Sequence, residues 1–418
     1  MPSEFINYES VRTWLYGLRN RGSSYGIDRM REFVEILGHP QSTFPCIHVA
    51  GTNGKGSVSA MLERIYRGSG LRVGLFTSPH LVHQGERIQV DRCRLSEDEI
   101  LQYTNELLPH ANQIAQRDPD NHPTFFEWMT AMAFVHFKRS KVDLAILETG
   151  LGGRLDSTNV VQPQASVITS IGLDHTEILG ETLGEIAKEK AGIIKRGRPV
   201  ILGRMPEDAS RVIKKIAYQR GSMVYSVEKD FSRRSLPKTN LFGTIQEWNA
   251  ATAVTTCEAL CEQFPVSSEV IEASLQDVSW AGRWSELRAE DRTIIFDAAH
   301  NADALESLCE NLSSLQHPPY VVAGFTGSAD RAKALLPVLE AKATEVVVVQ
   351  PTHDRGLHPS QFGIKSKASI QELFPANSVC TLGPSDATVV VTGSIYLVAE
   401  IYERLLYKTS RGHQLLQD

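Results

Sequence analysis

Short, continuous runs of apolar residues alternate with amphipathic segments of helical periodicity along most of the chain. Because these runs are mostly apolar and do not alternate with polar residues, they predict strands that are buried on both faces of a sheet. The strands expected first span residues 46–50, 72–77, 143–148, 165–171 and 200–202. The helices expected around them span residues 58–66, 95–107, 125–137, 182–194, 207–218 and 246–263. This alternation predicts an α/β fold with a doubly wound, mostly parallel sheet.

The same alternation starts again after a charged stretch at residues 286–292. The later strands are expected at residues 293–296, 320–323, 345–350 and 388–392, and the later helices at 331–341, 361–374 and up to about 406. A chain of 418 residues is long for a single hydrophobic core. We therefore predict a first domain at residues 1–284, a linker at 285–292, and a smaller C-terminal α/β, Rossmann-like domain at 293–418. The polar segment 80–92 has no clear period and is expected to be a loop.

The composition is that of a globular protein, with 42% hydrophobic and 22% charged residues. A formal net charge of −6 without a basic run argues against nucleic-acid binding. No apolar run reaches the roughly 18 residues that a membrane-spanning helix needs. The N-terminus lacks the layout of a signal peptide, and the six cysteines are scattered without a CxxC pair. These features favour a cytoplasmic protein with reduced thiols.

A glycine-rich turn follows the first predicted strand and precedes a predicted helix. Its glycines allow backbone N–H groups to point inward, its lysine supplies a mobile positive charge, and its serine can reach a magnesium ion. Val49 stands where the strict phosphate-loop spacing needs a glycine, so a plain strand–helix turn is the alternative interpretation. The predicted nucleotide-binding set is Gly51, Thr52, Asn53, Gly54, Lys55, Gly56 and Ser57.

Polar residues follow three other predicted strands, namely Ser78, Glu148 and His175. The carboxyl ends of parallel strands share one edge of a sheet, where ligands bind. A nucleoside triphosphate needs a metal ion, and magnesium prefers hard oxygen ligands such as those of Ser57, Ser78 and Glu148. The alternatives are a solvated strand-end carboxylate for Glu148 and a core histidine for His175.

Four further polar residues stand at positions that also have ordinary explanations. Lys190 can be an exposed helix lysine, and Arg283 can be a linker arginine in a salt bridge. Asp297 stands at the end of a predicted strand, where it can cap the next helix, and His300 can be a neighbour of the N-cap residue.

Taken together, the motifs resemble those of the folylpolyglutamate synthase/dihydrofolate synthase family, within the ATP-dependent Mur-ligase-type amide ligases. The resemblance extends from about residue 28 to residue 400 and rests on HVAGTNGKGS (48–57), FTSPHL (76–81), ETGLGGRLDSTN (148–159), GLDHTEILGETLGEIAKEKAGI (172–193), WAGR (280–283), FDAAHN (296–301) and TGSIYLVAE (392–400).

The resemblance implies a reaction in which ATP phosphorylates the carboxylate of dihydropteroate or the terminal glutamate of a folate. The α-amine of L-glutamate then attacks the acyl phosphate, and an amide forms. ATP and two magnesium ions are the implied cofactors, and folate or dihydropteroate and L-glutamate are the implied small-molecule substrates. The resemblance implies a P-loop ATP-binding first domain with a folate pocket. We expect a monomer without nucleic-acid or membrane partners.

For the nucleotide and metal sites, the resemblance implies that Lys55 contacts phosphates and that Ser57 and Glu148 bind magnesium. Ser78 and His175 would hold a second ion, and Lys190 would be carbamylated by CO₂. The remaining implied contacts are Asn249 to adenine, Arg283 to the phosphates, and Asp297 and His300 to the nucleotide and glutamate.

For the substrates, the resemblance implies that the 78–87 loop and a second glycine-rich turn border the pterin. The implied residues of this turn are Gly153, Arg154 and Asp156, with Phe125 and Phe126 as a lining. Ser394, at a helix start, would receive a glutamate carboxylate.

Three departures from the family pattern affect these implied contacts. Ile245 replaces a histidine near the adenine contact, Ala281 replaces the proline of a Trp-Pro-Gly-Arg sequence, and residues 324–333 lack the usual lysine- and aspartate-rich run. The alternatives to a folate ligase are a Mur-type ligase that acts on UDP-muramyl peptides and a P-loop protein that uses nucleotide as a switch.

Overall fold

The structure is a computed structural model that describes residues 4–18, 26–118, 121–289, 292–364, 368–376 and 378–406. It contains two units, which are described separately. The first comprises residues 1–239 and 247–278, and the second comprises residues 240–246 and 279–418. Residues 290–291 of the predicted linker and residues 407–418 of the predicted second domain lie outside the described residues.

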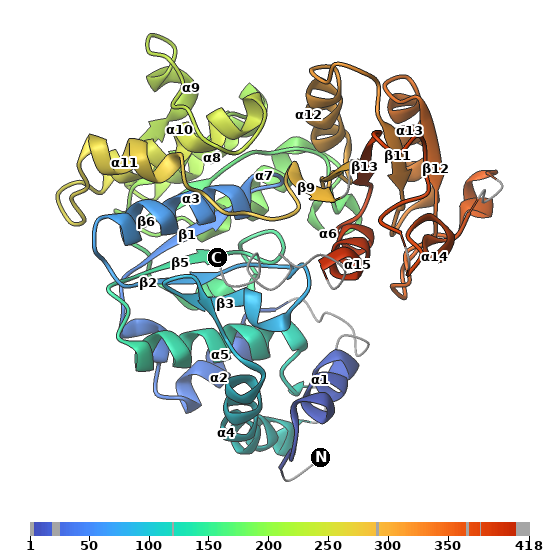
Figure 1. The fold of residues 1–418 in the computed structure, drawn as a ribbon. Coiled ribbons are helices and arrows are strands. Elements are labelled where there is room, and N and C mark those ends of the chain that lie inside the picture. The colour runs from blue at the N-terminus through green and yellow to red at the C-terminus, as the bar shows by residue number, and fades with distance from the viewer. Residues whose placement is uncertain are drawn as a thin grey trace. The chain divides into compact units, whose positions relative to one another are not determined.

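The first unit is built on an eight-stranded sheet in the order β4-β3-β2-β5-β1-β6-β7-β8 (Figure 1). Six neighbouring strands, from β2 to β8, are parallel, while β3 and β4 pair antiparallel at one edge. The strands are β1 (Cys46–Ala50), β2 (Val73–Phe76), β3 (Ile88–Val90), β4 (Cys93–Arg94), β5 (Leu144–Glu148), β6 (Ala165–Ile168), β7 (Val200–Leu202) and β8 (Val224–Ser226). The predicted doubly wound, mostly parallel sheet is confirmed.

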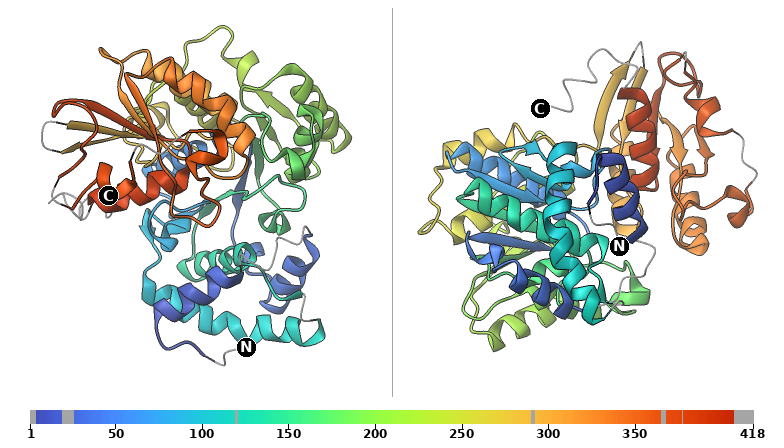
Figure 2. Two further views of the ribbon diagram at one scale, coloured as in Figure 1. Left: turned by 90° about the vertical axis from the view of Figure 1, so that its right-hand side faces the viewer. Right: turned by 90° about the horizontal axis from the view of Figure 1, so that it is seen from below.

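Helices cover both faces of this sheet (Figures 1 and 2). Residues of α1, α2, α4 and α5 form one core with strand residues such as Phe76 and Leu147, and residues of α7 and α8 form another with Ile168 and Leu202. The helices are α1 (Tyr8–Gly17), α2 (Asp28–Ile36), α3 (Lys55–Gly68), α4 (Glu97–Arg117), α5 (Phe125–Ser140), α6 (Thr176–Leu179), α7 (Leu183–Lys190), α8 (Glu207–Gln219), α9 (Val227–Asp230), α10 (Thr244–Ala259), whose first residues belong to the second unit, and α11 (Ser268–Leu275). None of the helices among the described residues has the length and hydropathy to cross a membrane.

The register of the three central strands sets the position of the site. On β1, Val49 pairs with Glu148 of β5, and Ala50 pairs with Ile168 of β6. The ends of β5, β1 and β6 therefore lie side by side at the carboxyl edge of the sheet. The glycine-rich turn after β1, Glu148 and the residues after Ile168 are brought together by this register.

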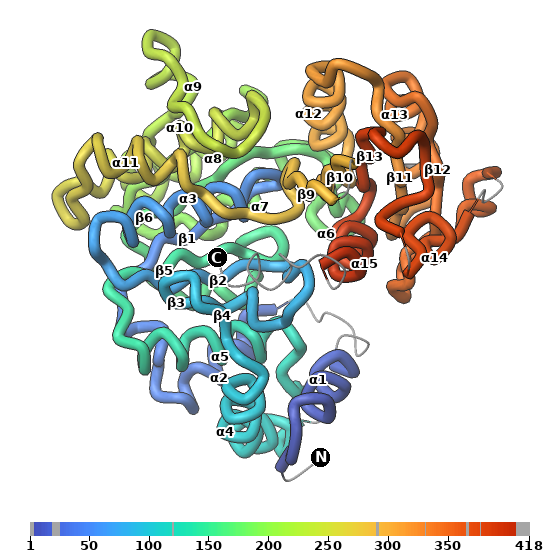
Figure 3. The backbone as a smooth tube through the Cα atoms, in the orientation of Figure 1, coloured from blue at the N-terminus to red at the C-terminus, as the bar shows by residue number. Residues whose placement is uncertain are grey.

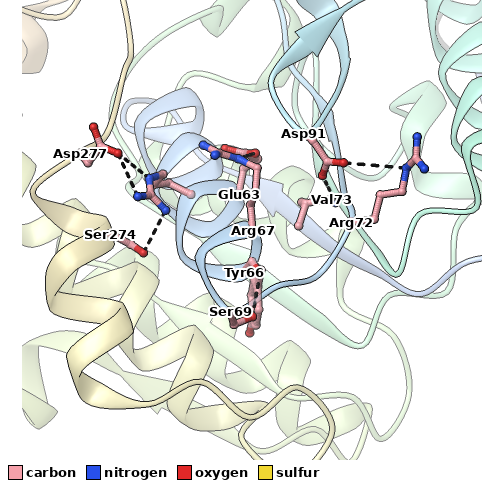
Figure 4. A network of polar contacts seen from close by, with 10 residues as sticks. Glu63, Tyr66, Arg67, Ser69, Arg72, Val73, Asp91, Ser274 and Asp277 are labelled. Atoms are coloured by element: carbon pink, nitrogen blue, oxygen red, sulfur yellow. Dashed lines mark hydrogen bonds and ion pairs between the residues drawn. The ribbon is translucent and has the colours of Figure 1, made fainter. Parts of the chain in front are cut away.

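The far end of α3 is fastened by a polar network (Figure 4). Glu63 is buried and accepts a hydrogen bond from Arg67 Nε at 2.6 Å, and burial raises the pKa of its carboxyl group. Arg64 pairs with Asp277 at 2.9 Å, which joins α3 to the segment after α11. The helix that begins in the glycine-rich turn is thus held at its opposite end by charged contacts as well as by the core.

The second unit contains a five-stranded sheet in the order β12-β11-β13-β10-β9, parallel except for β9. Its strands are β9 (Ser285–Ala289), β10 (Arg292–Phe296), β11 (Tyr320–Ala323), β12 (Glu345–Val348) and β13 (Thr388–Thr392). Its helices are α12 (Ala302–Leu312), α13 (Ala329–Glu340), α14 (Ile370–Leu373) and α15 (Ile395–Leu406). The predicted smaller α/β unit is present.

Three predicted segments differ from the structure. The expected linker at residues 285–292 contains β9, which pairs antiparallel with β10 and leaves Leu287 and Ala289 buried. The expected loop at 80–92 contains a 3-10 turn (Gln84–Arg87) and β3, whose three residues are too few to display a period (the chain trace is seen in Figure 3). The expected helix at 361–374 is interrupted after a 3-10 turn by Gly363, which has a left-handed φ of 79°.

Candidate active site

The glycine-rich turn links β1 to the first turn of α3. The helix begins at Lys55, three residues before its predicted start, so Lys55, Gly56 and Ser57 form its first turn. A Cβ on Gly51 would lie 1.9 Å from Thr169 Oγ1, and a Cβ on Gly54 would lie 2.5 Å from Asn249 Oδ1. Glycine is therefore required at both positions by close neighbours. The unpaired N–H groups of a first helical turn and the helix dipole favour an anion here.

Residues that follow β6 hold this turn in place. Thr169 Oγ1 donates a hydrogen bond to Asn53 O at 2.6 Å, and Ser170 O accepts one from Thr52 N at 2.8 Å. Ser170 Oγ accepts another from Asn53 N at 2.9 Å. Thr169 and Ser170 are not among the site residues predicted from the sequence. Their signal is a pair of hydroxyl residues directly after an apolar strand.

Two lysines converge on the carbonyl of Gly51. Lys55 Nζ donates to Gly51 O at 3.1 Å, and Lys190 Nζ, at the end of α7, donates to the same oxygen at 2.8 Å. Lys190 is only 4% exposed, so the exposed-lysine alternative is wrong. Burial, followed by the positive charge of Lys55, lowers the pKa of Lys190 to about 7, and Asp174 and Asp156 act in the opposite direction. A substantial fraction of Lys190 is therefore uncharged near neutral pH.

Glu148 and Ser78 come together at the ends of β5 and β2. Glu148 is 4% exposed and its Oε2 accepts a hydrogen bond from Ser78 N at 3.2 Å, so it is not a solvated strand-end carboxylate. Ser57 Oγ, 2% exposed in the first turn of α3, has no hydrogen-bond partner among the described residues. A buried hydroxyl without a partner and a buried carboxylate are oxygen donors of the kind that magnesium prefers.

These residues do not form a site that could hold a metal ion through side chains alone. No group of three or more His, Cys, Asp or Glu side chains is placed to hold a metal within the described part of the chain. Magnesium in nucleotide sites commonly takes one or two protein oxygens and completes its shell with water and phosphate. The donors Ser57 and Glu148 fit that kind of site.

His175 precedes α6 with a left-handed φ of 49°. Its side chain is 48% exposed, and Nδ1 lies 3.8 Å from Glu177 Oε1. The core-histidine alternative is therefore wrong. Its coordination of a second ion stays a prediction.

The first turn of α5 lies against the second glycine-rich turn. A Cβ on Gly150 would lie 2.6 Å from the ring of Phe126, which also contacts Phe76 with ring centroids 5.7 Å apart. Phe125 contacts Tyr16 at 5.7 Å between centroids, and the Arg87 guanidinium lies 5.2 Å from its ring. Both phenylalanines thus face segments that border Glu148 or the 78–87 loop.

The rest of the second glycine-rich turn is folded onto the end of α7. A Cβ on Gly153 would lie 2.8 Å from Lys190 O, and Arg154 N donates to Glu189 O at 2.8 Å. Asp156 is buried and accepts hydrogen bonds from Leu151 N and Thr158 N, both at 2.9 Å, while burial raises the pKa of its carboxyl group. These contacts hold the second glycine-rich turn against the backbone of Glu189 and Lys190. A substrate role for Gly153, Arg154 and Asp156 stays a prediction.

The second unit places its predicted site residues near the carboxyl ends of β10 and β13. Asp297 is buried, and its carboxylate accepts hydrogen bonds from Trp284 N at 3.1 Å and Ala299 N at 3.0 Å. Burial raises the pKa of Asp297, and the charge of Arg283 opposes this effect. His300 Nδ1 lies 2.9 Å from Ala298 O, and Ser394 Oγ accepts from Tyr396 N at 3.1 Å. Their ligand contacts stay predictions.

The first unit combines a mostly parallel sheet, a phosphate-binding type of turn, and a buried carboxylate and a buried lysine near that turn. These features place it in the class of Mur-type ligase domains. The family model of the Mur ligase middle domain matches residues 49–241. The chain belongs to the dihydrofolate synthase/folylpolyglutamate synthase family. It is 33% identical to the dihydrofolate synthase/folylpolyglutamate synthase of Bacillus subtilis, across 96% of this chain and 100% of that protein. It is 30% identical to the folylpolyglutamate synthase of Lacticaseibacillus casei, across 96% and 99%.

Solved structures of this family have the same fold. A folylpolyglutamate synthase complex with AMPPCP and folate superposes with a TM-score of 0.84 at 31% identity, covering 96% of this chain and 100% of that one. Escherichia coli FolC in complex with DHPP and ADP superposes with a TM-score of 0.82 at 30% identity, covering 98% and 100%. The family and fold predicted from the sequence are confirmed.

Proposed function

We propose that this chain is an ATP-dependent ligase that joins L-glutamate to a folate, and to dihydropteroate as well. The observation that carries the proposal is the grouping of the phosphate turn, Lys190 and Glu148 at one sheet edge. Family members whose structures contain an ATP analogue with folate, or ADP with DHPP, support the same substrates.

The chemistry explains why such a site needs concentrated positive charge. A carboxylate is a poor electrophile, and its own negative charge repels a triphosphate. A carboxylate oxygen attacks the γ-phosphorus of ATP and ADP leaves, which gives an acyl phosphate. The α-amine of glutamate then attacks the acyl carbon, loses a proton and expels phosphate, so that an amide bond forms.

The residues of the phosphate turn supply binding and orientation. The N–H groups of the first turn of α3, from Lys55 to Ser57, would bind phosphate oxygens, and Lys55 would exchange its contact with Gly51 O for a phosphate. Ser57 and Glu148 would hold one magnesium ion, and Ser78 and His175 would hold a second. Magnesium neutralises charge on the transferred phosphoryl group when it is bound.

Lys190 is the residue in this site that we propose to be modified. Its uncharged amine adds CO₂ and releases a proton, which gives a carbamate anion. The burial of Lys190, its lowered pKa of about 7 and its place beside the phosphate turn support this assignment. The anion would help to organise the metal-binding side of the turn.

Phosphate release measured in parallel assays tests the proposed function. We expect release that requires ATP, Mg²⁺, L-glutamate and either tetrahydrofolate or dihydropteroate. Release driven by a UDP-muramyl peptide instead of a folate would identify a cell-wall ligase. Release that ignores both glutamate and folate would identify a nucleotide switch, and either result would overturn the proposal.

A further inference from the structure

A buried ion pair joins α2 to the first turn of α5. Arg29 Nε donates to Glu127 Oε2 at 2.6 Å, and the two side chains are 7% and 3% exposed. Removing two charges from water is costly, and apolar residues of similar size often give equal stability at such positions. A contribution to stability alone therefore explains this ion pair poorly. Its geometry suggests a second role, which is to fix the position of helix α5.

Glu127 is also part of the cap of α5. The same oxygen, Oε2, accepts hydrogen bonds from Thr124 N at 2.7 Å and Thr124 Oγ1 at 3.0 Å. These contacts form a capping box, in which the third helical residue reaches back to the cap. One oxygen with three donors, one of them from another helix, fixes both where α5 begins and how it is rotated about its axis.

Phe125 and Phe126 lie between the cap and Glu127 in the same helical turn. Phe126 packs on Gly150, two residues after Glu148, and Phe125 packs against Tyr16 and Arg87. Consecutive residues of a helix point about 100° apart, so a rotation of the first turn moves both rings together. The directions of these rings therefore depend on the bond that Glu127 makes with Arg29.

We propose that Arg29 and Glu127 are positioning residues that hold Phe125 and Phe126 against the pterin end of the substrate. This inference rests on the proposed function, since it takes these two rings to line the pterin site. Arg29 acts through Glu127 and does not touch the substrate. It sets the affinity for the pterin-bearing substrate and leaves the phosphate turn, on α3, unaffected.

Steady-state kinetics with four variants test this role. R29M leaves the Glu127 carboxylate without its positively charged partner, whereas R29M/E127Q removes both charges and keeps the capping box, because glutamine also serves at that position. R29K retains a positive charge. R117M is the matched control. Arg117 also forms an ion pair with α2, the helix that carries Arg29, because it lies 2.8 Å from Glu32, but the Arg117 side chain is 66% exposed.

The expected result separates positioning from stability. R29M/E127Q unfolds at a temperature close to that of the wild type, yet its KM for tetrahydrofolate or dihydropteroate rises about tenfold while its KM for ATP is unchanged. The KM of R29K for the pterin-bearing substrate lies between those of the wild type and R29M/E127Q. R117M matches the wild type in this KM and in unfolding temperature. A wild-type KM for the pterin substrate in R29M/E127Q, or an equal rise in the KM for ATP, would overturn the inference.

F126A distinguishes this inference from the proposed function on which it rests. We expect F126A to raise the KM for the pterin substrate more than R29M/E127Q does. If F126A raises that KM and R29M/E127Q does not, the positioning role is wrong and the pterin site stands. If F126A leaves that KM unchanged, the assignment of the pterin site is wrong, and the inference falls with it.

Discussion

Replacing Lys190 by methionine removes an amine from a buried site and retains an unbranched side chain of similar length. The pKa of Lys190 falls from 10.5 to about 7 on folding, mainly because burial disfavours the charged form. At ~1.4 kcal/mol per pKa unit, this difference corresponds to about 5 kcal/mol of lost stability for the protonated lysine. This is an upper value, because protein and solvent relax around a buried charge.

The stability difference between K190M and the wild type should depend on pH, and its direction follows from proton binding at Lys190. Between pH 7 and pH 10.5 the unfolded chain binds a proton at Lys190 that the folded chain does not, so the stability of the wild type rises with pH. K190M has no amine at this position, so its stability lacks the pH dependence that Lys190 causes. We expect K190M to be more stable than the wild type at pH 7, by an amount that shrinks to about 1–2 kcal/mol at pH 9.5.

Urea unfolding at both pH values, in buffer free of CO₂, measures this difference. The lowered pKa of Lys195, about 8, contributes equally to both proteins and cancels. An advantage of K190M that is the same at pH 7 and pH 9.5 would refute the reasoning, because the burial of Lys190 would then not involve a change of protonation.

The same variant tests the carbamate. With ¹³C-labelled bicarbonate, the wild type should show a carbamate resonance that K190M lacks, and K190M should lose most of its turnover without rescue by bicarbonate. K195M is the matched control, because Lys195 is a partly buried lysine that donates to Asn159 O at 3.0 Å, whereas Lys190 donates to Gly51 O in the phosphate turn. Near-normal turnover in K190M, or loss of the resonance in K195M, would contradict the assignment.

Three further substitutions test the phosphate turn and its metal donors. Gly51→Ala brings a Cβ to 1.9 Å from Thr169 Oγ1, so we expect overpacking of about 1–3 kcal/mol and loss of ADP binding in calorimetry; unchanged ADP affinity would contradict this. Glu148→Gln keeps an acceptor for Ser78 N but loses the charge, so the Mg²⁺ concentration for half-maximal activity should rise at least about tenfold, and an unchanged requirement would count against the site. Ser57→Ala should weaken Mg²⁺ activation without lowering the unfolding temperature. Ser59→Ala should change neither, although it removes another buried hydroxyl of α3 that has no hydrogen-bond partner in the described part of the chain; equal effects of the two substitutions would remove Ser57 from the metal site.

The sequence predicts the central strands and the phosphate turn well because their signals are local. An apolar run such as residues 46–50 is buried on both faces, and a glycine-rich turn follows it directly. The strand-end position of Glu148 follows from the same pattern, since its strand is apolar up to that residue.

The parts that the sequence could not predict depend on partners far away along the chain. β9 is the exception, because its partner β10 is the next strand; it differs from the predicted strands because Ser285–Ala289 alternates exposed charged residues with buried ones instead of forming an apolar run. The Arg29–Glu127 bond joins residues 98 positions apart, and the bond from Thr169 to Asn53 spans 116. No local period marks such contacts, and yet they fix the geometry of the candidate site.

The convergence of Lys55 and Lys190 on one carbonyl explains why a single turn can serve two chemical roles. Two ammonium groups beside Gly51 O repel each other, and the charge of Lys55 helps to lower the pKa of Lys190. Lys55 is half-buried at the start of α3, where we propose that it contacts phosphate, whereas Lys190 is buried and becomes the uncharged member of the pair. Only an uncharged amine reacts with CO₂, which is why we propose Lys190, and not Lys55, as the modified residue.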